Sequence, residues 1–405
     1  SKFESDLPKL HGHKGIGVIS DHDPQPLIIG SHLGTFAIVT VSKINNIETL
    51  AAKAFQNKRH FSEMSDGETS PTELVAMLVS EAESFEDGIQ YAQKAIKGSC
   101  SMLLLTEDGI YAARDKLGRT PLVIGKKDGA YAAASESCAF PNLGYEIEKN
   151  LGPGETALIT AEGIEQRKPP RDQMQICAFL WVYYGYPATS YEGINVEATR
   201  NRCGRLLAQN DSVDIDFVAG IPDSGIGHAI GYAHEKNIPY VRPFVKYTPT
   251  WPRSFMPQNQ SIRDLVAKMK LIPIKELIED RRILFCEDSI VRGTQLQDTI
   301  QILYEYGAKE VHMRPACPTL IYPCNFLSFS TSRSTLDLAG RKAIATLEGT
   351  EDKHLAEYAK AGSEKNLAMV DNIRQRLKLT SLQYQKLEDL VAAIGMPKEK
   401  LCTHC

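Results

Sequence analysis

The sequence predicts an α+β domain followed by an α/β domain whose sheet is parallel. First, the chain has 405 residues, of which 42% are apolar and 24% charged, and this length is typical of two domains of about 100–200 residues each. Second, strands and helices occur in blocks up to about residue 165. Third, strands and helices alternate strictly from about residue 195, so the boundary lies within 165–195.

The N-terminal part contains short apolar segments that predict strands separated by turns. Helices are predicted over 70–83, where Ser70 and Pro71 suit a helix start, and over 85–96. Strands and helices in blocks are typical of an α+β layer, which we assign to residues 1–165. The expected strands cover 26–30, 35–41, 101–105 and 156–160.

The C-terminal part alternates between the two kinds of element, which predicts βαβ units and a parallel sheet. The expected helices cover 197–209, 227–236, 262–269 and 294–306, and the expected strands cover 217–221, 240–245, 283–286 and 310–314. A last amphipathic helix is predicted over 379–394. We therefore assign residues 166–375 to the second domain and 376–405 to a C-terminal helix and tail.

Charge and hydropathy exclude several classes of partner. The chain has 46 Lys and Arg residues and 50 Asp and Glu residues, a formal net charge of −4, so we expect no general attraction to nucleic acid or to an anionic membrane. The apolar runs are shorter than the roughly 18 residues that a membrane-spanning helix needs. Residues 1–5 lack the apolar core of a signal peptide, and we expect a cytoplasmic protein.

The segment after the predicted strand 283–286 carries the strongest signal for function. Two adjacent carboxylates, Glu287 and Asp288, come directly after this strand and precede a small-residue loop and a helix start. Such carboxylates suit the two hydroxyls of a ribose, and unpaired N–H groups at a helix start suit its 5′-phosphate. By composition alone, a capped helix with two solvated acids is an equally good interpretation. The loop residues that we expect to contact substrate are Ser289, Arg292, Gly293 and Thr294.

The full string Phe-Cys-Glu-Asp-Ser-Ile-Val-Arg-Gly-Thr over 285–294 resembles the phosphoribosyl-pyrophosphate (PRPP) loop of type I phosphoribosyltransferases. Its Asp-Ser-Ile-Val-Arg-Gly core is similar to that of the amidophosphoribosyltransferase family. Segments 114–125, 134–139 and 152–155 resemble the glutaminase domain of this family, and 214–225 resembles its pyrophosphate loop. The resemblance implies an α+β sandwich like that of N-terminal-nucleophile (Ntn) hydrolases, followed by an α/β type I phosphoribosyltransferase domain with a parallel sheet.

The resemblance also implies roles in phosphoribosyl transfer from PRPP with Mg²⁺. Glu287 and Asp288 would be catalytic, by orienting the ribose and stabilising its positive charge in the transition state. Lys246 is a candidate counter-charge, although a solvated surface lysine is an equal alternative. In the family's closing loop, of which Arg253 would be a part, the chain departs from the usual pattern and has two stiffening prolines. The residues expected to bind pyrophosphate are Asp223, Ser224 and Gly225.

The glutaminase residues of the family are largely missing. The His-Asn-Gly of its oxyanion hole falls on Thr40-Val41-Ser42, and the Asp that binds the glutamine amino group falls on Pro71. The Arg-Tyr-x-Thr segment that binds the glutamine carboxylate is missing between residues 20 and 25. We therefore expect that glutaminase activity is lost.

The first residue is a further departure from the family. An Ntn glutaminase uses a first-position Cys whose own amino group is the base, whereas this chain begins with Ser1. Ser1 as a hydroxyl nucleophile is one alternative, and a chain that lacks its true N-terminus is another. A missing N-terminus does not explain Thr40, Val41 or Pro71.

The chain has nine cysteines, and the last two form a C-x-x-C pair at Cys402 and Cys405. Together with Cys177 and Cys324, this pair matches the positions of the ligands in the iron–sulfur branch of the family. The resemblance implies a 4Fe-4S cluster on these four thiolates. Zn²⁺ at the same ligands, with His404 as a possible substitute ligand, and unrelated free thiols are the alternatives.

Taken together, the residues predict a protein that binds PRPP or a nucleotide and transfers phosphoribosyl to ammonia or to another amine, which a partner could supply. The product would be 5-phosphoribosylamine, an intermediate of purine biosynthesis. The alternative is a non-catalytic homologue that binds PRPP or a nucleotide as a regulatory subunit or scaffold. We also expect a homo-oligomer.

Overall fold

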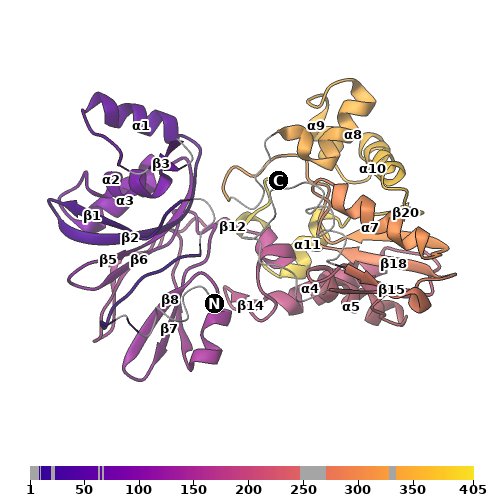
Figure 1. Cartoon of the computed structure of the whole chain (residues 1–405), viewed down its shortest axis with the longest axis horizontal. Helices are drawn as coiled ribbons and strands as arrows, with labels where there is room; N and C mark the ends of the chain where they lie inside the picture. Colours follow the sequence, from indigo (N-terminus) through magenta and orange to yellow (C-terminus); the bar gives the residue numbers. More distant parts are fainter. Residues whose placement is uncertain are drawn as a thin grey trace.

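The computed structural model describes residue 9 and residues 11–19, 23–62, 64–65, 68–246, 271–327 and 334–405. Figure 1 shows an N-terminal and a C-terminal half lying side by side, with the chain end between them. Within the residues that the structure describes, none of the helices combines the length and apolar character needed to span a lipid bilayer.

The N-terminal half is built on a large antiparallel sheet. Its strands, in spatial order, are β1 (Leu27–Ser31), β2 (Gly34–Ile44), β5 (Gly98–Leu105), β6 (Ile110–Ala113), β10 (Thr156–Ile159) and β11 (Ile164–Lys168). A smaller antiparallel sheet contains β8 (Ala130–Ala134), β7 (Val123–Lys127) and β9 (Glu146–Asn150). The predicted strands at 26–30, 35–41, 101–105 and 156–160 all lie in the large sheet, as an α+β fold requires.

Two hydrophobic cores hold the N-terminal layers together. One core lies between the large sheet and helices α2 (Pro71–Val79) and α3 (Phe85–Ala95), which follow α1 (Ile47–Gln56). Ser70 caps α2 by accepting a hydrogen bond from the Glu73 amide at 3.3 Å, which is why the helix starts where the sequence predicts. The second core joins the two sheets and contains Ala112, Leu122, Ile124, Leu151, Ala157 and Ile159. The result is the predicted two-sheet sandwich.

The C-terminal half contains a parallel sheet with the order β15 (Phe217–Gly220), β18 (Arg282–Glu287), β19 (Glu310–Pro315) and β20 (Ser381–Leu382). Alternate residues of its strands enter two different cores. Val218 and Leu284 lie in one core, and Phe217 and Ile283 lie in the other. The strands are apolar on both faces because helices cover both faces.

Helices α4 (Val196–Gln209), α5 (Gly225–Lys236) and α11 (Leu387–Ile394) contribute to the first of these cores. The second core contains residues of α7 (Thr294–Glu305), α8 (Ala339–Glu348), α9 (Leu355–Ala359) and α10 (Glu364–Arg376). A parallel sheet with helices on both faces confirms the predicted α/β class.

Two predicted elements of this half are wrong. The helix expected over 379–394 begins only at Leu387, because residues 381–382 pair with β19 as β20. The strand expected over 240–245 is reduced to a single parallel bridge between Tyr240 and Val218. Pro243 has no N–H to donate, and beyond it β16 (Phe244–Lys246) pairs antiparallel with β17 (Leu271–Pro273) outside the parallel sheet. The helix expected over 262–269 lies outside the described residues.

Short strand pairs complete the fold. The end of the chain returns to the start of the C-terminal half, and Figure 1 shows part of the yellow C-terminal segment near β12. There β12 (Ile176–Cys177) pairs in parallel with β21 (Leu401–Cys402). The other pairs are β13 (Ser190–Tyr191) with β14 (Ile194–Asn195) and β3 (Met64–Ser65) with β4 (Glu68–Thr69). A wide helical turn over Leu180–Tyr184 lies between β12 and β13.

Candidate functional site

The carboxyl ends of β15 and β18 lie side by side, with Gly220 paired to Cys286. The loops that follow these strands are therefore brought to one edge of the sheet. Glu287 is the last residue of β18, and Asp288 follows it; their exposed fractions are only 9% and 6%. A site at the carboxyl edge of a parallel sheet is where α/β proteins usually bind ligands.

Asp288 connects the two loops. The Ser224 hydroxyl, in the loop after β15, donates to Oδ2 of Asp288 at 2.5 Å. The Ser289 hydroxyl donates to Oδ1 at 2.5 Å. Both carboxylate oxygens thus accept hydrogen bonds from hydroxyl groups, and a ribose presents two groups of this kind.

Glu287 is held in a different environment from its neighbour. Its Oε1 accepts a hydrogen bond from the Asp288 amide at 3.0 Å. Burial raises the pKa of the Glu287 carboxyl well above its usual range, and the negative charge of Asp288 raises it further. The site therefore combines two adjacent carboxyl groups, of which Glu287 holds its proton to higher pH than an ordinary glutamate.

Two helices start after the loops that follow β15 and β18. Helix α5 begins at Gly225, where an added Cβ would lie 2.3 Å from the Cys286 carbonyl oxygen, so only glycine allows this approach to β18. Helix α7 begins at Thr294 after Gly293, whose φ of 77° favours glycine. The partial positive charge at both helix starts favours an anion.

Of the other residues predicted to bind substrate, some form ion pairs and one lies outside the described residues. Lys246 pairs with Asp223 at 2.5 Å, and both side chains are at least half exposed. Arg292 pairs with Asp337 at 3.4 Å. Arg253 lies outside the described residues. The structure thus brings Asp223, Ser224, Gly225, Glu287, Asp288 and Ser289 to one edge of the sheet, with Lys246 attached through its ion pair.

The cysteines predicted as ligands also converge. Cys177 lies opposite Cys402 in the β12–β21 pair. The Cys405 carbonyl accepts a hydrogen bond from the Ile321 amide at 3.1 Å, which brings the chain end to the segment that contains Cys324. We call Cys177, Cys324, Cys402 and Cys405 the cysteine centre.

The thiols of the cysteine centre influence one another electrostatically. Burial raises the pKa of Cys177 well above its usual range, and negative charge on Cys405, Cys402 and Cys324 adds to the effect. Burial, with Cys324 and Cys402, raises the pKa of Cys405 to about 12. Across the described part of the chain, however, no three His, Cys, Asp or Glu side chains are arranged to hold a single metal ion.

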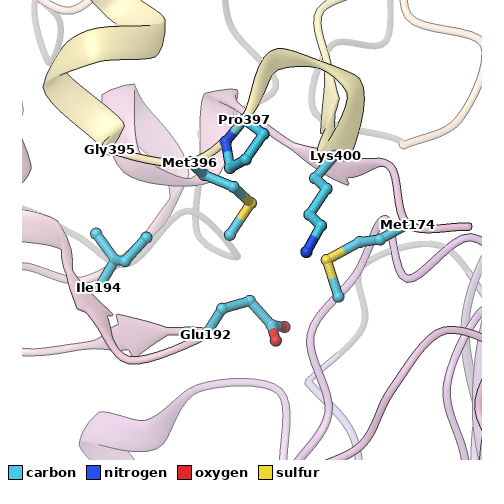
Figure 2. Close-up of a pocket in the computed structure, with 7 residues that line it drawn as sticks. All are labelled: Met174, Glu192, Ile194, Gly395, Met396, Pro397 and Lys400. Carbon is cyan, nitrogen blue, oxygen red and sulfur yellow. The ribbon is translucent and has the colours of Figure 1, made fainter. Parts of the chain in front are cut away.

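A cavity of about 310 Å³ lies elsewhere, next to the segment that leads to Cys402. Figure 2 shows the Lys400 and Glu192 side chains pointing into it from opposite sides, with Met174 and Met396 flanking them. Glu192 also accepts a hydrogen bond from the buried Arg114 at 2.7 Å. The cavity contains none of the residues predicted for substrate binding, so we do not assign it to the phosphate.

The sequence prediction missed the residues of the N-terminal half that contact the cysteine centre. Lys43 donates a hydrogen bond to the Cys324 carbonyl, although the two residues are 281 positions apart. The Arg119 guanidinium lies 3.6 Å from the ring centre of Phe326. A half-buried lysine and a buried arginine have no local sequence pattern that identifies such distant partners.

Comparisons with known proteins agree with this geometry. Residues 13–142 match the family model of the glutamine amidotransferase domain. The chain is 33% identical to the amidophosphoribosyltransferase of Archaeoglobus fulgidus over 330 residues, which is 81% of this chain and 72% of the relative. It is 30% identical to that of Methanocaldococcus jannaschii over 423 aligned positions, covering 98% of this chain and 83% of the relative.

A solved structure shows the same arrangement over most of the chain. The glutamine PRPP amidotransferase of Bacillus subtilis, complexed with ADP and GMP, aligns with a TM-score of 0.77 and 28% identity. The alignment covers 95% of this chain and 79% of that one. The predicted resemblance and fold class are confirmed, and the chain belongs to the amidophosphoribosyltransferase family.

Proposed function

We propose that this protein binds PRPP at the loop after β18 and transfers its phosphoribosyl group to ammonia, which forms 5-phosphoribosylamine for purine biosynthesis. The observation that carries the proposal is the Ser224–Asp288 hydrogen bond of 2.5 Å, because it joins the loops after β15 and β18 beside a helix start. An acidic pair alone is common in proteins. An acidic pair tied to a second loop at the carboxyl edge of a parallel sheet is much more specific.

Each part of PRPP has a counterpart in this arrangement. The ribose hydroxyls would replace the Ser224 and Ser289 hydroxyls as donors to Asp288, while Glu287 provides the neighbouring carboxyl group. The start of α7 suits the 5′-phosphate and the start of α5 suits the pyrophosphate. The residues proposed for phosphate and pyrophosphate binding are Asp223, Ser224, Gly225, Lys246, Arg253, Ser289, Arg292, Gly293 and Thr294.

In the proposed reaction, the bond between C1 of the ribose and the pyrophosphate oxygen breaks with its electron pair going to pyrophosphate. The lone pair of ammonia forms the new C–N bond, and one proton leaves the nitrogen for solvent. The protein stabilises the positive charge on the ribose through Asp288 and holds the two reactants in place. Mg²⁺, held largely by substrate oxygens, supplies charge neutralisation for the leaving pyrophosphate.

Side chains at and next to Thr40 and Pro71, the positions that align with glutaminase residues of the family, support the proposed loss of glutaminase activity. Thr40 and Thr72 share a hydrogen bond of 2.9 Å between their hydroxyls, and Thr72 donates to Asp23 at 2.7 Å. Gln25 accepts from the Thr40 amide at 2.7 Å and donates to Asp23 at 2.8 Å. These groups therefore satisfy one another.

The neighbouring positions lack the groups that glutamine would need. Val41 follows Thr40 in β2, is 43% exposed, and has no polar group for an oxyanion. Pro71 is the first residue of α2 and offers neither a carboxylate nor an amide hydrogen. We therefore propose that ammonia, or an amine delivered by a partner, is the nitrogen source.

We also propose that the cysteine centre holds a 4Fe-4S cluster. Four thiolates on one Zn²⁺ ion would have to converge on a single point at about 2.3 Å each. The four thiolates of a cluster are spread over a larger unit. The pairing of Cys177 with Cys402, and the hydrogen bond that brings Cys405 to the segment containing Cys324, support a shared centre of four thiolates. Iron and sulfide analysis of anaerobically purified protein tests this assignment.

The main test is pyrophosphate release from PRPP with Mg²⁺ and an ammonium salt. We expect turnover in the parent protein and a loss of at least about 100-fold in Asp288→Asn, because one group that stabilises transition-state charge is removed. Equal rates in the parent and in Asp288→Asn would exclude the enzyme. In that case calorimetry with PRPP and with purine nucleotides decides whether the protein is a non-catalytic binding homologue.

A further inference from the structure

Residues of the N-terminal half contact the segment that contains Cys324. We call residues 322–327 the Cys324 loop. Lys43, near the end of β2, donates a hydrogen bond from Nζ to the Cys324 carbonyl. Asn45 follows β2 and donates from Nδ2 to the Asn325 carbonyl at 2.6 Å. Two consecutive carbonyl groups of the Cys324 loop are therefore held by one strand end of the other half.

Arg119 extends this contact to two further parts of the cysteine centre. Its guanidinium lies 3.6 Å from the ring centre of Phe326, in the Cys324 loop. The same ring makes an edge contact with His404, which lies between the C-terminal cysteines, at 5.4 Å between ring centres. The Arg119 carbonyl accepts a hydrogen bond from the Cys177 amide at 3.3 Å. Arg119, with an exposed fraction of 5%, thus contacts the Cys324 loop and Cys177 directly and reaches the C-terminal cysteine pair only through Phe326.

The segment that leads to Cys177 is also held by the N-terminal half. The Leu117 carbonyl accepts a hydrogen bond from the Gln175 amide at 2.7 Å. The Gln175 side chain accepts another from Arg119 at 3.2 Å. Residues 117–119 therefore run along residues 175–177, directly before and at the first ligand of the cysteine centre.

We propose that the N-terminal half has a role other than glutamine hydrolysis: it clamps and covers the cysteine centre, with Lys43, Asn45 and Arg119 as the positioning residues. This role rests on the proposed function of the four cysteines as one centre, and it is independent of phosphoribosyl transfer. A chain that has lost its glutaminase residues would still need this half, because without it the Cys324 loop loses these donors and the stacking partner of Phe326.

The chemistry of these contacts favours clamping over incidental packing. A hydrogen bond from a charged donor such as the Lys43 ammonium is roughly twice as strong as a neutral one. The attraction between an arginine guanidinium and an aromatic ring is stronger when the pair is buried. The contacts also reach backbone carbonyl groups of the loop, so they fix the path of the main chain beside Cys324.

The test compares the double variant Lys43→Met/Asn45→Ala with the parent in metal-free protein. The rate of alkylation of each cysteine is measured by mass spectrometry under reducing, anaerobic conditions. We expect Cys324 to react about tenfold faster in the double variant, as the loss of one or two hydrogen bonds allows. Cys138, which lies in the N-terminal half outside the centre, should react at the parent rate and serves as the internal reference.

Lys53→Met is the matched control, because Lys53 donates at 3.3 Å to Tyr91 within the N-terminal half. It should leave the Cys324 rate unchanged. Asn45 is exposed, so the single variant Asn45→Ala provides a second measurement if the double variant folds poorly. An unchanged Cys324 rate in Lys43→Met/Asn45→Ala, or an equal increase in Lys53→Met, overturns the proposal.

A second readout separates this role from the other proposals. In protein reconstituted with iron and sulfide, the double variant should lose iron in air several-fold faster than Lys53→Met. If no iron binds in any variant, the cluster is excluded, while faster alkylation of Cys324 still supports the clamp. If pyrophosphate release is absent throughout, phosphoribosyl transfer is excluded and the alkylation result stands.

Discussion

Glu287 is a buried carboxyl group in the proposed site, and its pKa differs from that of an exposed glutamate. It is 9% exposed, and burial together with the charge of Asp288 raises the pKa of Glu287. The folded protein therefore binds this proton more tightly than the unfolded chain does. The resulting contribution to stability is fully present below the ordinary glutamate pKa of about 4.3 and is lost as the pH rises through the folded-state pKa.

Replacement of Glu287 by Gln should remove this pH dependence. We expect the free energy of unfolding of the parent to fall, relative to that of Glu287→Gln, as the pH rises from about 5 to about 8. Urea denaturation at several pH values measures the difference. The exposed Glu399→Gln variant is the control and should follow the parent. If Glu287→Gln also follows the parent at every pH, Glu287 does not have a raised pKa.

Gly225 determines how closely α5 approaches β18. An alanine Cβ would lie 2.3 Å from the Cys286 carbonyl, so Gly225→Ala should push the helix start away from the acidic pair. We expect a loss of about 1–3 kcal/mol in the free energy of unfolding, with weaker PRPP binding by calorimetry. Gly163→Ala is the control because an added Cβ there has no neighbour within 4 Å. Equal effects of both changes would contradict the assigned role.

At the scale of elements, a buried ion pair connects β19 to the end of α4. Asp211 follows α4 and accepts hydrogen bonds from Arg314 of β19 and, at 2.8 Å, from Tyr232 of α5. Both charged side chains are at most 4% exposed. Burial opposes ionisation, but the hydrogen bonds and charge of Arg314 hold the pKa of Asp211 below its usual range. The stability that ionised Asp211 contributes to the fold is therefore present above the ordinary aspartate pKa and is lost at strongly acidic pH.

Arg314→Met should therefore destabilise the C-terminal half, because a buried carboxylate would lose its counter-charge. We expect a loss of about 3–5 kcal/mol in the free energy of unfolding at neutral pH. Arg282→Met, which removes partners of Asp214 and Asp216 nearer the surface, is the comparison and should have a much smaller effect. Similar losses in both variants, measured by urea denaturation, would show that burial of the Arg314 pair has no special importance.

Local patterns predicted the elements that carry their own signals. The strand, acidic pair and helix at 282–305 were predictable because an apolar run, two carboxylates and a glycine occur in sequence. The short strand β20 was not predictable, because its pairing with β19 joins segments about 70 residues apart and outweighs the helical pattern that continues from residue 387. Tertiary pairing decided between two structures that the local sequence allows.

The same distinction applies to the site. Ser224 and Asp288 are 64 positions apart, yet the rule that loops meet at the carboxyl edge of a parallel sheet predicts their proximity. Contact of Lys43 with the Cys324 carbonyl depends on how the two halves of the molecule dock. Strand and helix patterns contain no information on that docking, so the contact made by Lys43 could be found only in the structure.

At the scale of the whole molecule, the two halves should differ in chemical competence. The hydroxyl and amide groups of Thr40, Thr72 and Gln25 are engaged with one another or with Asp23, next to the positions proposed to have lost glutamine binding. We therefore expect no glutamate release from glutamine, and no glutamine-supported pyrophosphate release, under conditions where an ammonium salt supports turnover. Glutamine-dependent rates equal to those with ammonium would contradict the loss of glutaminase activity.

The most direct test of the central claim is a crystal structure of the protein with Mg²⁺ and a non-hydrolysable PRPP analogue. We predict that the ribose hydroxyls contact Glu287 and Asp288, that they replace the Ser224 hydroxyl at Asp288, and that the 5′-phosphate lies at the start of α7. An analogue bound in the cavity beside Lys400, or an empty loop after β18 at saturating analogue, would contradict the account.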